Sequence, residues 1–441
     1  MQKNTDRIHS EKDSELYLQL KWADIKPNTN CILKNGTQLC IISSGIHNKV
    51  AGPDFKNACI KINGVICHGD VEIHKKATDW ISHKHTRNSD YDNVILHVVE
   101  KNDITPSSVP FLPETTIITF DELPQQNDKI SSKSLCSSFF RKMSPQNIIN
   151  FLEDAGKERL KIRSESLVGN IIAIGINKTF LNALTIQLGI PGNRECFQQI
   201  GARLIRYSDD LLEEKYEAII WGESGLLPDF CVENRMSLDG KMLVKQLWNN
   251  WWPLRLNGEH ISKIQRNGRP YNTPERKIAL LVAIFQLFLK NSHEYFENIF
   301  LTESYDKILN TFKENLRTDS YWDSHTSFYS KKLEKKINLV SDARINELAV
   351  DVFLPLIYAN AKIHADEKKM DSVYETYKKI PPLPSNTITR LMLATCFNNQ
   401  KKIIPSAITQ QGLIHLYRNY CEKKAFHCTA CTMYQSFNTQ G

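Results

Sequence analysis

The hydrophobic pattern of the chain changes its period along the sequence. Residues 1–125 contain short runs rich in Val and Ile, separated by Asn-Gly, Gly-Pro-Asp and Asn-Ser-Asp-Tyr-Asp-Asn segments, which is typical of β-strands joined by turns. These runs are TQLCIIS, KNACIKI, GVICHGDVEIH and NVILHVVEK. Before them, residues 11–23 place Leu16, Leu20 and Ala23 at helical spacing, with Glu15 beside that face. The pattern therefore predicts a short amphipathic helix followed by strands.

The later part of the chain has a helical pattern. Proline and serine cluster between residues 103 and 135, which indicates a boundary, and we assign residues 126–142 to a linker. Ser144 and Thr273 are each followed by proline, as at the start of a helix. Further helices are expected at 178–189, 193–206, 209–221, 237–248, 341–362 and 366–379.

These patterns predict an α+β protein. Residues 1–125 are expected to form a mixed sheet with flanking helices, and residues 143–441 a large all-α region that ends in a Cys-rich segment. The segment DWISHKH, between the last two predicted strands, is read as a short helix or a loop, with Asp79 near its start.

Three residues of the predicted sheet are candidates for chemistry. Glu72 and His74 lie two apart on one strand and therefore share a face. If the strands on either side of Asn63-Gly64 form a hairpin, Asp54 comes close to Glu72. Two carboxylates so placed are a natural site for Mg²⁺ or Mn²⁺, and a histidine beside them could orient or deprotonate a metal-bound water. This set fits phosphodiester cleavage, although acids and a hydrogen-bonded histidine on a sheet also occur without any such role.

Other histidines lie near Glu72 in the sequence. His83 and His85 are two positions apart, and His97 lies on an apolar strand, where a buried core histidine is the commoner outcome. We hold these three as secondary candidates.

The motifs of this region resemble those of a bacterial family known as "domain of unknown function 2851". The shared pieces are Gly-Pro-Asp-Phe, Gly-x-Val-Glu-Ile-His, Asp-Trp-x-x-His-x-His and Leu-His-Val-Val, together with GRPYNTPERKIA at 268–279 and the closing GLIHLYRNYCEKKAFHCTAC. The resemblance covers essentially the whole chain and names no activity.

A looser resemblance is to the PD-(D/E)xK phosphodiesterase superfamily. Its order of helix with Glu, strand, Pro-Asp, strand, Glu-x-Lys, helix and strand matches Glu15, Asp54 and Glu72 in this chain. The resemblance implies a restriction-endonuclease-like sheet, with Asp54 and Glu72 as metal ligands and Glu15 as an accessory acid. His74 departs from the pattern, because most members carry lysine there, and this departure places activity in doubt.

Two other functions remain open. The first is a cupin-like all-β barrel in which His83, His85 and Glu72 hold a transition metal. The second is a degenerate nuclease fold that serves as a non-catalytic scaffold for nucleic acid or protein. A helix at 11–23 packed on a mixed sheet would favour the nuclease-like core over the barrel.

The last residues of the chain carry a second candidate metal site. Cys421, Cys428 and Cys431 have a spacing that suits Zn²⁺ or a [4Fe–4S] cluster, and three unligated thiols are the alternative. The fourth ligand is open, with His427, Cys136 and Cys396 as candidates.

Composition adds only weak constraints. Lysine and arginine total 56 against 49 acidic residues, so the net charge of +7 permits DNA or RNA as a partner without requiring one. Arg269 and Arg276, near a group of tryptophans, are candidate nucleic-acid contacts. The N-terminus lacks a secretory signal, and no apolar run reaches the roughly 20 residues of a membrane span. We expect a cytoplasmic protein without a membrane partner.

Overall fold

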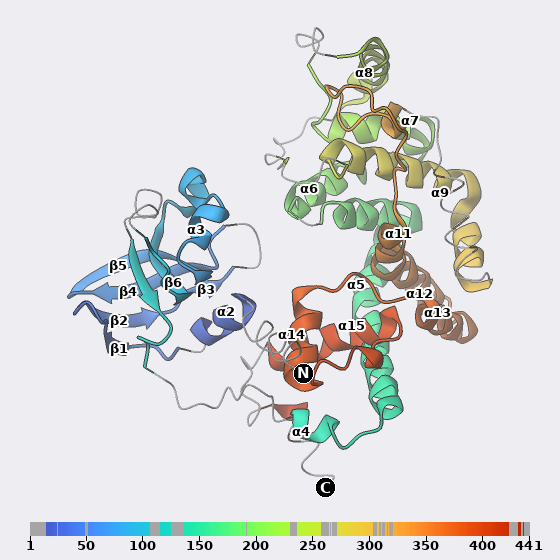
Figure 1. Ribbon diagram of the computed structural model, residues 1–441. Helices are drawn as coiled ribbons and strands as arrows, with labels where there is room; N and C mark the ends of the chain where they lie inside the picture. Colours follow the sequence, from blue (N-terminus) through green and yellow to red (C-terminus); the bar gives the residue numbers. More distant parts are fainter. Residues whose placement is uncertain are drawn as a thin grey trace. The chain divides into compact units, whose positions relative to one another are not determined.

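The computed structural model describes most of the 441-residue chain. Its described residues are 15–23, 25–48, 52–105, 115–124, 136–190, 192–229, 236–256, 264, 266, 271–302, 307, 310, 314, 316, 321–422, 431–433 and 435. The chain forms two compact units (Figure 1). Unit 1 comprises Met1–Ala155, Ser385–Ile404 and Gly412–Gly441, and unit 2 comprises Gly156–Pro384 and Pro405–Gln411. The boundary predicted at 126–142 stays a prediction.

Unit 1 contains a mixed seven-stranded sheet. Its strands are β1 (Thr29–Ile32), β2 (Gln38–Ser43), β3 (Ile46–His47), β4 (Phe55–Ile62), β5 (Val65–Lys76), β6 (Val94–Lys101) and β7 (Thr116–Thr119). The order is β1-β2-β4-β5-β6-β7, with β3 on β4. Pairing is antiparallel from β1 to β5 and parallel from β5 through β6 to β7. The α+β class and the four predicted strands are confirmed.

The turn between β4 and β5 sets the register of the central hairpin. Asn63 and Gly64 have φ values of 47° and 88°, and the flanking residues Ile62 and Val65 pair directly. Positive φ at both turn residues matches the right-handed twist of the strands, which is why Asn-Gly favours this turn. The register continues to the pair Ala58 and Gly69, then shifts, and beyond the shift Phe55 pairs with Val71.

One helix packs on the sheet, as the amphipathic pattern predicted. In α2 (Glu15–Ala23), Leu18 and Trp22 are buried in a cluster with Ile41, Phe55 and Val71 from the strands. The connection from β5 to the parallel strand β6 passes through three short elements, α3 (Asp79–Ser82), η2 (His85–Arg87) and η3 (Ser89–Tyr91). The described part of unit 1 is therefore a mixed sheet with a helix packed on it rather than an all-β barrel, and the metal site of the cupin-like alternative stays a prediction.

The other helices of unit 1 have a separate apolar cluster. They are α4 (Cys136–Phe140), the first part of α5 (Pro145–Leu188), α14 (Thr387–Cys396), η9 (Lys401–Ile403) and η10 (Tyr417–Cys421), with the end of α15 (Ala407–Leu416). Phe140, Leu152, Met392 and Leu413 are buried in this cluster. The helix α4 lies within the predicted linker.

Unit 2 is helical. It contains the rest of α5, and α6 (Arg194–Leu204), α7 (Asp209–Glu223), α8 (Leu238–Trp251), η6 (Trp252–Leu254), α9 (Pro274–Thr302), η7 (Tyr321–Asp323), α11 (Asp342–Leu348), η8 (Ala349–Phe353), α12 (Leu354–Ile363) and α13 (Glu367–Lys379). The predicted caps are confirmed, since Ser144 Oγ accepts from the Asn147 amide and Thr273 Oγ1 from the Arg276 amide. Beyond β7, the described residues include no strand, as expected.

One described helix, α5, is long and apolar enough to meet the criteria for a membrane span. A single such helix is weak evidence for a membrane span, because core helices of soluble proteins meet the same criteria. Its φ and ψ values are non-helical at Gly175, and Phe180, Leu181 and Leu184 beyond that point are fully buried.

Gly69 on β5 and Gly169 on α5 provide a matched test of the packing. A Cβ at Gly69 would come within 2.5 Å of both Asn93 O and Ile95 Cγ2, whereas one at Gly169 would meet nothing within 4 Å. We expect Gly69→Ala to lower the free energy of unfolding by about 1–3 kcal/mol, as overpacking does. Gly169→Ala, at an exposed position of helix α5, should raise the free energy of unfolding by about 0.5–1 kcal/mol. Thermal unfolding of the two variants should therefore shift in opposite directions.

Candidate metal centre

The structure brings Asp54 and Glu72 together. Asp54 lies just before β4 and Glu72 lies on β5, and the pairing of Phe55 with Val71 sets the two carboxylates side by side. The amide of Asp54 donates to Glu72 Oε2 at 3.0 Å, and the amide of Ile73 donates to Asp54 Oδ2 at 2.9 Å. Each carboxylate is thus held by the backbone of the neighbouring strand.

The helix α2 contributes to the same site. Gln19 Nε2 donates to Asp54 Oδ1 at 2.6 Å, and the charge of Glu15, one turn earlier, acts on Asp54. Sequence reasoning singled out Glu15 and missed Gln19. The signal was available, because residues four apart on a helix share a face and Gln19 follows Glu15 by four.

Burial and neighbouring charges separate the pKa values of the two carboxyl groups. Burial, followed by the charge of Glu72, raises the pKa of Asp54 to about 8. Burial also pushes the pKa of Glu72 upward, but hydrogen bonds from His74 and His85 outweigh this effect and hold that pKa below its usual value. At neutral pH the metal-free site therefore has a neutral Asp54 beside a charged Glu72.

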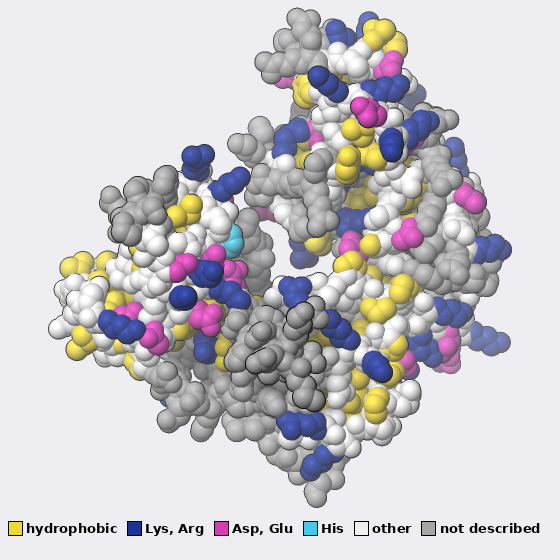
Figure 2. All heavy atoms as spheres, viewed as in Figure 1, with side chains coloured by type: hydrophobic (Ala, Val, Ile, Leu, Met, Phe, Trp, Pro, Cys, Tyr) yellow, Lys and Arg dark blue, Asp and Glu magenta, His cyan; other side chains and the backbone are white. Residues whose placement is uncertain are grey.

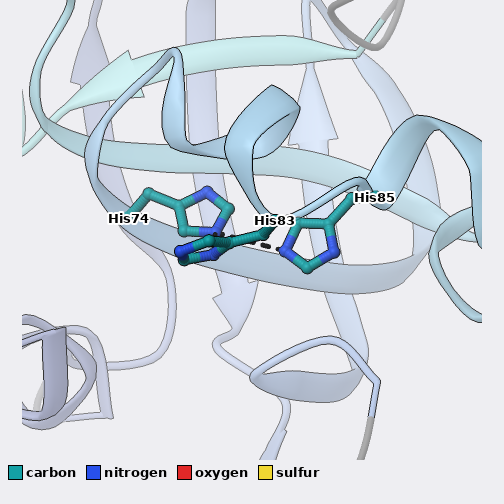
Figure 3. Close-up of side chains that lie close together, drawn as sticks. All are labelled: His74, His83 and His85. Carbon is teal, nitrogen blue, oxygen red and sulfur yellow. Dashed lines mark hydrogen bonds between the residues drawn. The ribbon is translucent and has the colours of Figure 1, made fainter. Parts of the chain in front are cut away.

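The imidazoles of His74, His83 and His85 lie close together (Figure 3). His74 Nε2 lies 3.1 Å from His83 Nδ1 and 3.3 Å from His85 Nε2. Glu72 Oε1 lies 3.3 Å from His74 Nε2 and 3.2 Å from His85 Nε2. The nitrogens of the three histidines all lie within 4.8 Å of one another, so this set could hold a metal ion. The predicted catalytic residue His74 and the secondary candidates His83 and His85 thus belong to one cluster.

The backbone at Lys84 explains how His83 and His85, on either side of it, both come close to His74 Nε2. In a regular helix, residues two apart project to nearly opposite sides. Lys84 instead adopts the left-handed conformation, with φ 62° and ψ 29°, between α3 and η2. A non-glycine residue in this conformation is uncommon and carries strain, which is often found at functional sites.

Aromatic residues and His97 fix the orientation of the rings. The ring of Tyr91 stacks on His85 with centroids 3.7 Å apart, and the edge of Trp80 meets the same imidazole at 5.3 Å. His97 Nε2 lies 2.9 Å from His74 Nδ1, and burial, together with the charge of His74, lowers the pKa of His97 to about 3. His97 Nδ1 is buried without a hydrogen-bond partner among the described residues. The contact with His97 therefore helps to fix the orientation of the His74 ring.

The structure describes part of the C-terminal cysteine site. Cys421 and Cys431 are buried in the same apolar cluster as Cys136 and Cys396. Cys428 and His427 lie outside the described residues. The metal predicted there stays a prediction.

The two predicted nucleic-acid contacts differ in status. Arg269 lies outside the described residues. Arg276 is only 3% exposed, and its guanidinium donates to the carbonyls of Tyr271, Trp322 and Asn338. These bonds tie together segments of unit 2 and leave Arg276 little surface for a ligand.

The fold and site define a mixed α+β protein with a carboxylate and histidine cluster on its sheet. Residues 15–386 match the family described as "Protein of unknown function (DUF2851)", and the chain belongs to this family. Comparison with curated proteins finds no match. Comparison with solved structures likewise finds none.

Asp54 and Asp70 provide a test of the electrostatics. For the metal-free protein we expect Asp54→Asn to be more stable than wild type, because the raised pKa means that folding disfavours the charged carboxylate. The difference in melting temperature should widen as the pH rises from 3.8 towards about 8. Asp70, which pairs with Lys56 Nζ at 2.9 Å, is the matched control, and Asp70→Asn should lower stability. A melting-temperature difference for Asp54→Asn that does not vary with pH would contradict this account.

Proposed function

We propose that this chain is a metal-dependent phosphodiesterase that acts on nucleic acid. The observation that carries the proposal is the contact between the start of β4 and β5, where the Asp54 amide donates to Glu72 Oε2 and Asp54 Oδ2 accepts from the Ile73 amide. Each carboxylate keeps further lone pairs for a cation, because an ionised carboxylate has about four acceptor positions. Mg²⁺ or Mn²⁺ is the proposed ion at this pair.

The order of elements supports the same proposal. A helix that carries Glu15 packs on a sheet in which β2, β4 and β5 are antiparallel and β6 is parallel to β5. The crossover between β5 and β6 contains α3. This order supports the proposal of a nuclease-like core, in which Asp54 and Glu72 would be the metal ligands.

The residues of the site would share the chemistry of hydrolysis. A divalent ion lowers the pKa of a bound water and neutralises charge that develops on the phosphate. Asp54 and Glu72 would hold that ion, and Gln19 and Ile73 orient the Asp54 carboxylate. His74, where most members of the resembled superfamily carry lysine, would orient the attacking water.

Two features favour nucleic acid as the substrate. The net charge of +7 favours a polyanion. In unit 2, Trp252 is 49% exposed and the guanidinium of Arg255 lies 3.5 Å over its ring, a pair of the kind that stacks on bases. Figure 2 shows Lys and Arg side chains spread among Asp and Glu on one face, so the surplus charge is not gathered in one patch there.

A cleavage assay on single- and double-stranded DNA and RNA tests the proposal. With Mg²⁺ or Mn²⁺ present, wild-type protein should cleave at least one substrate. Asp54→Ala and Glu72→Ala should each reduce the rate by more than about 100-fold, because each removes a ligand of the ion. Asp70→Asn, on the same strand as Glu72 but paired with Lys56, should keep most of the activity.

The competing function is a non-catalytic scaffold with a degenerate nuclease fold, which His74 in place of lysine favours. Wild-type protein that is inert on all four substrates, and that binds nucleic acid equally well with and without Asp54→Ala, would replace our proposal with this one. Cleavage that survives Asp54→Ala would show that the chemistry lies elsewhere in the chain.

We also propose a metal at the C-terminal cysteines, either Zn²⁺ or a [4Fe–4S] cluster. Protein purified without oxygen should lose one metal centre in Cys428→Ser and keep it in Cys40→Ser, since Cys40 lies on β2. Cys136 and Cys396 share an apolar cluster with Cys421 and Cys431, so serine substitution of each should identify the fourth ligand. Equal and negligible metal in wild type and Cys428→Ser would refute this site. Elemental analysis and visible absorption give the readout.

A further inference from the structure

We infer that His74, His83 and His85, together with Glu72 Oε1, form a binding site for a transition-metal ion of the Zn²⁺, Mn²⁺, Fe²⁺ or Co²⁺ class. The site adjoins the Asp54 and Glu72 pair and uses the other oxygen of Glu72. The inference rests on the proposed function in one respect only, which is the use of the ion in phosphodiester hydrolysis. The binding site itself rests on the geometry of the four side chains.

Four of the six distances between these four atoms match those around a tetrahedral ion. Metal–nitrogen bonds of about 2.0–2.1 Å place tetrahedral ligands about 3.3–3.4 Å apart. His74 Nε2 lies 3.1 Å from His83 Nδ1, 3.3 Å from His85 Nε2 and 3.3 Å from Glu72 Oε1. Glu72 Oε1 lies 3.2 Å from His85 Nε2. All four separations are close to the edge of such a tetrahedron.

Hydrogen bonds alone account poorly for this arrangement. A ring nitrogen of neutral histidine carries either one N–H or one lone pair. His74 Nε2 has three neighbours at 3.1–3.3 Å, and one well-aligned hydrogen bond is all that it can direct at them. The remaining short contacts set two N–H groups or two electron pairs against one another, and a cation at the centre, bound by the lone pair of each ligand, would replace that repulsion by attraction.

The kinds of ligand select the class of ion. Imidazole nitrogens suit Zn²⁺ and other transition metals, whereas Mg²⁺ prefers oxygen ligands and water. Three nitrogens and one carboxylate oxygen are thus a poor set for Mg²⁺. They are a good set for an ion that polarises a bound water, and His74 then acts on that water through the ion that it helps to hold.

The surroundings resemble those of known metal ligands. A metal-binding histidine usually engages its second ring nitrogen in a hydrogen bond that fixes the ring, and His74 Nδ1 is 2.9 Å from His97 Nε2. Tyr91 stacks on His85 and fixes the second ring. His83 is exposed while the other two histidines are buried, so the ion would be reachable from solvent, as a catalytic metal must be.

Metal analysis of the full chain tests the site. Wild-type protein should bind one equivalent of Zn²⁺ or Co²⁺ that His83→Ala and His85→Ala fail to bind, with affinity weakened by more than about 100-fold. His68→Ala, which removes an exposed histidine from the same strand β5, is the matched control and should bind normally. Asp54→Ala is the second control, because it leaves all four ligands in place. Counting the equivalents lost relative to wild type separates this ion from any metal at the C-terminal cysteines.

His97 gives an independent check as a positioning residue. His97→Ala should weaken Co²⁺ binding by about 10–100-fold, and His97→Gln, which retains an acceptor for His74 Nδ1, should recover part of the loss. The visible absorption of bound Co²⁺, together with X-ray absorption showing imidazole ligands, reports the coordination directly.

The outcomes separate this inference from the proposed function. Binding of Co²⁺ and Zn²⁺ that is equal in wild type, His83→Ala and His85→Ala would overturn the site, as would loss of the ion in Asp54→Ala. If the ion binds as expected but no nucleic acid is cleaved, the site stands and the proposed function falls. Mg²⁺-dependent cleavage by wild type, together with Co²⁺ and Zn²⁺ binding that is equal in wild type, His83→Ala and His85→Ala, would overturn the site and leave the proposed function standing.

Discussion

The pairing register between β4 and β5 is the constraint on which the site depends. Asn63 and Gly64 form the turn with positive φ at both positions, and they start a register that runs from the pair Ile62 and Val65 to the pair Ala58 and Gly69. A shift of this register between Ala58 and Phe55 then sets Phe55 opposite Val71. Side chains alternate across a sheet, so a slip of one residue would send Glu72 to the other face. The amide of Asp54 would then lose its acceptor. The turn and the shift together therefore position Asp54 beside Glu72.

A β-bulge in the same hairpin also affects where Asp54 lies relative to Glu72. The register shifts between Phe55 and Ala58, where Asn57 has a φ of 56°. The amide of Asn57 donates to Asp70 Oδ1, which gives the unpaired donor of the bulge an acceptor. Bulges re-aim nearby side chains and are common next to functional sites. Here the bulge lies between the regular part of β4 and the end that carries Asp54.

The sequence predicted the parts of the structure that depend on local pattern. The four long strands, the Asn63-Gly64 turn and the caps at Ser144 and Thr273 follow from residue preferences over a few positions, and all are present. Short edge strands such as β7 were missed, because four residues give too little alternation to recognise. The helices after residue 380 fall within the predicted all-α region, but their individual bounds were not predicted.

Long-range convergence was predicted only in part. The hairpin argument brought Asp54 near Glu72, because a single turn connects the two strands. It did not join His74 to His83 and His85, since their meeting depends on the left-handed backbone at Lys84, for which the sequence carries no glycine or asparagine signal. Gln19 shares a helix face with Glu15, but its hydrogen bond to Asp54 depends on how α2 packs on the sheet, and it was missed.

The exposure of His83 has a kinetic consequence. Glu72 and His74 lie on a central strand, and His85 is pinned against Tyr91, so three ligands stay in place with or without an ion. His83 stands at the solvent side, just before the strained turn at Lys84. An ion would therefore enter and leave by displacement of this one imidazole. The rate at which the ion exchanges and the affinity for the ion can therefore vary separately. A change that relaxes the turn at Lys84 would alter how fast His83 closes on the ion and would leave the other three ligands as they are.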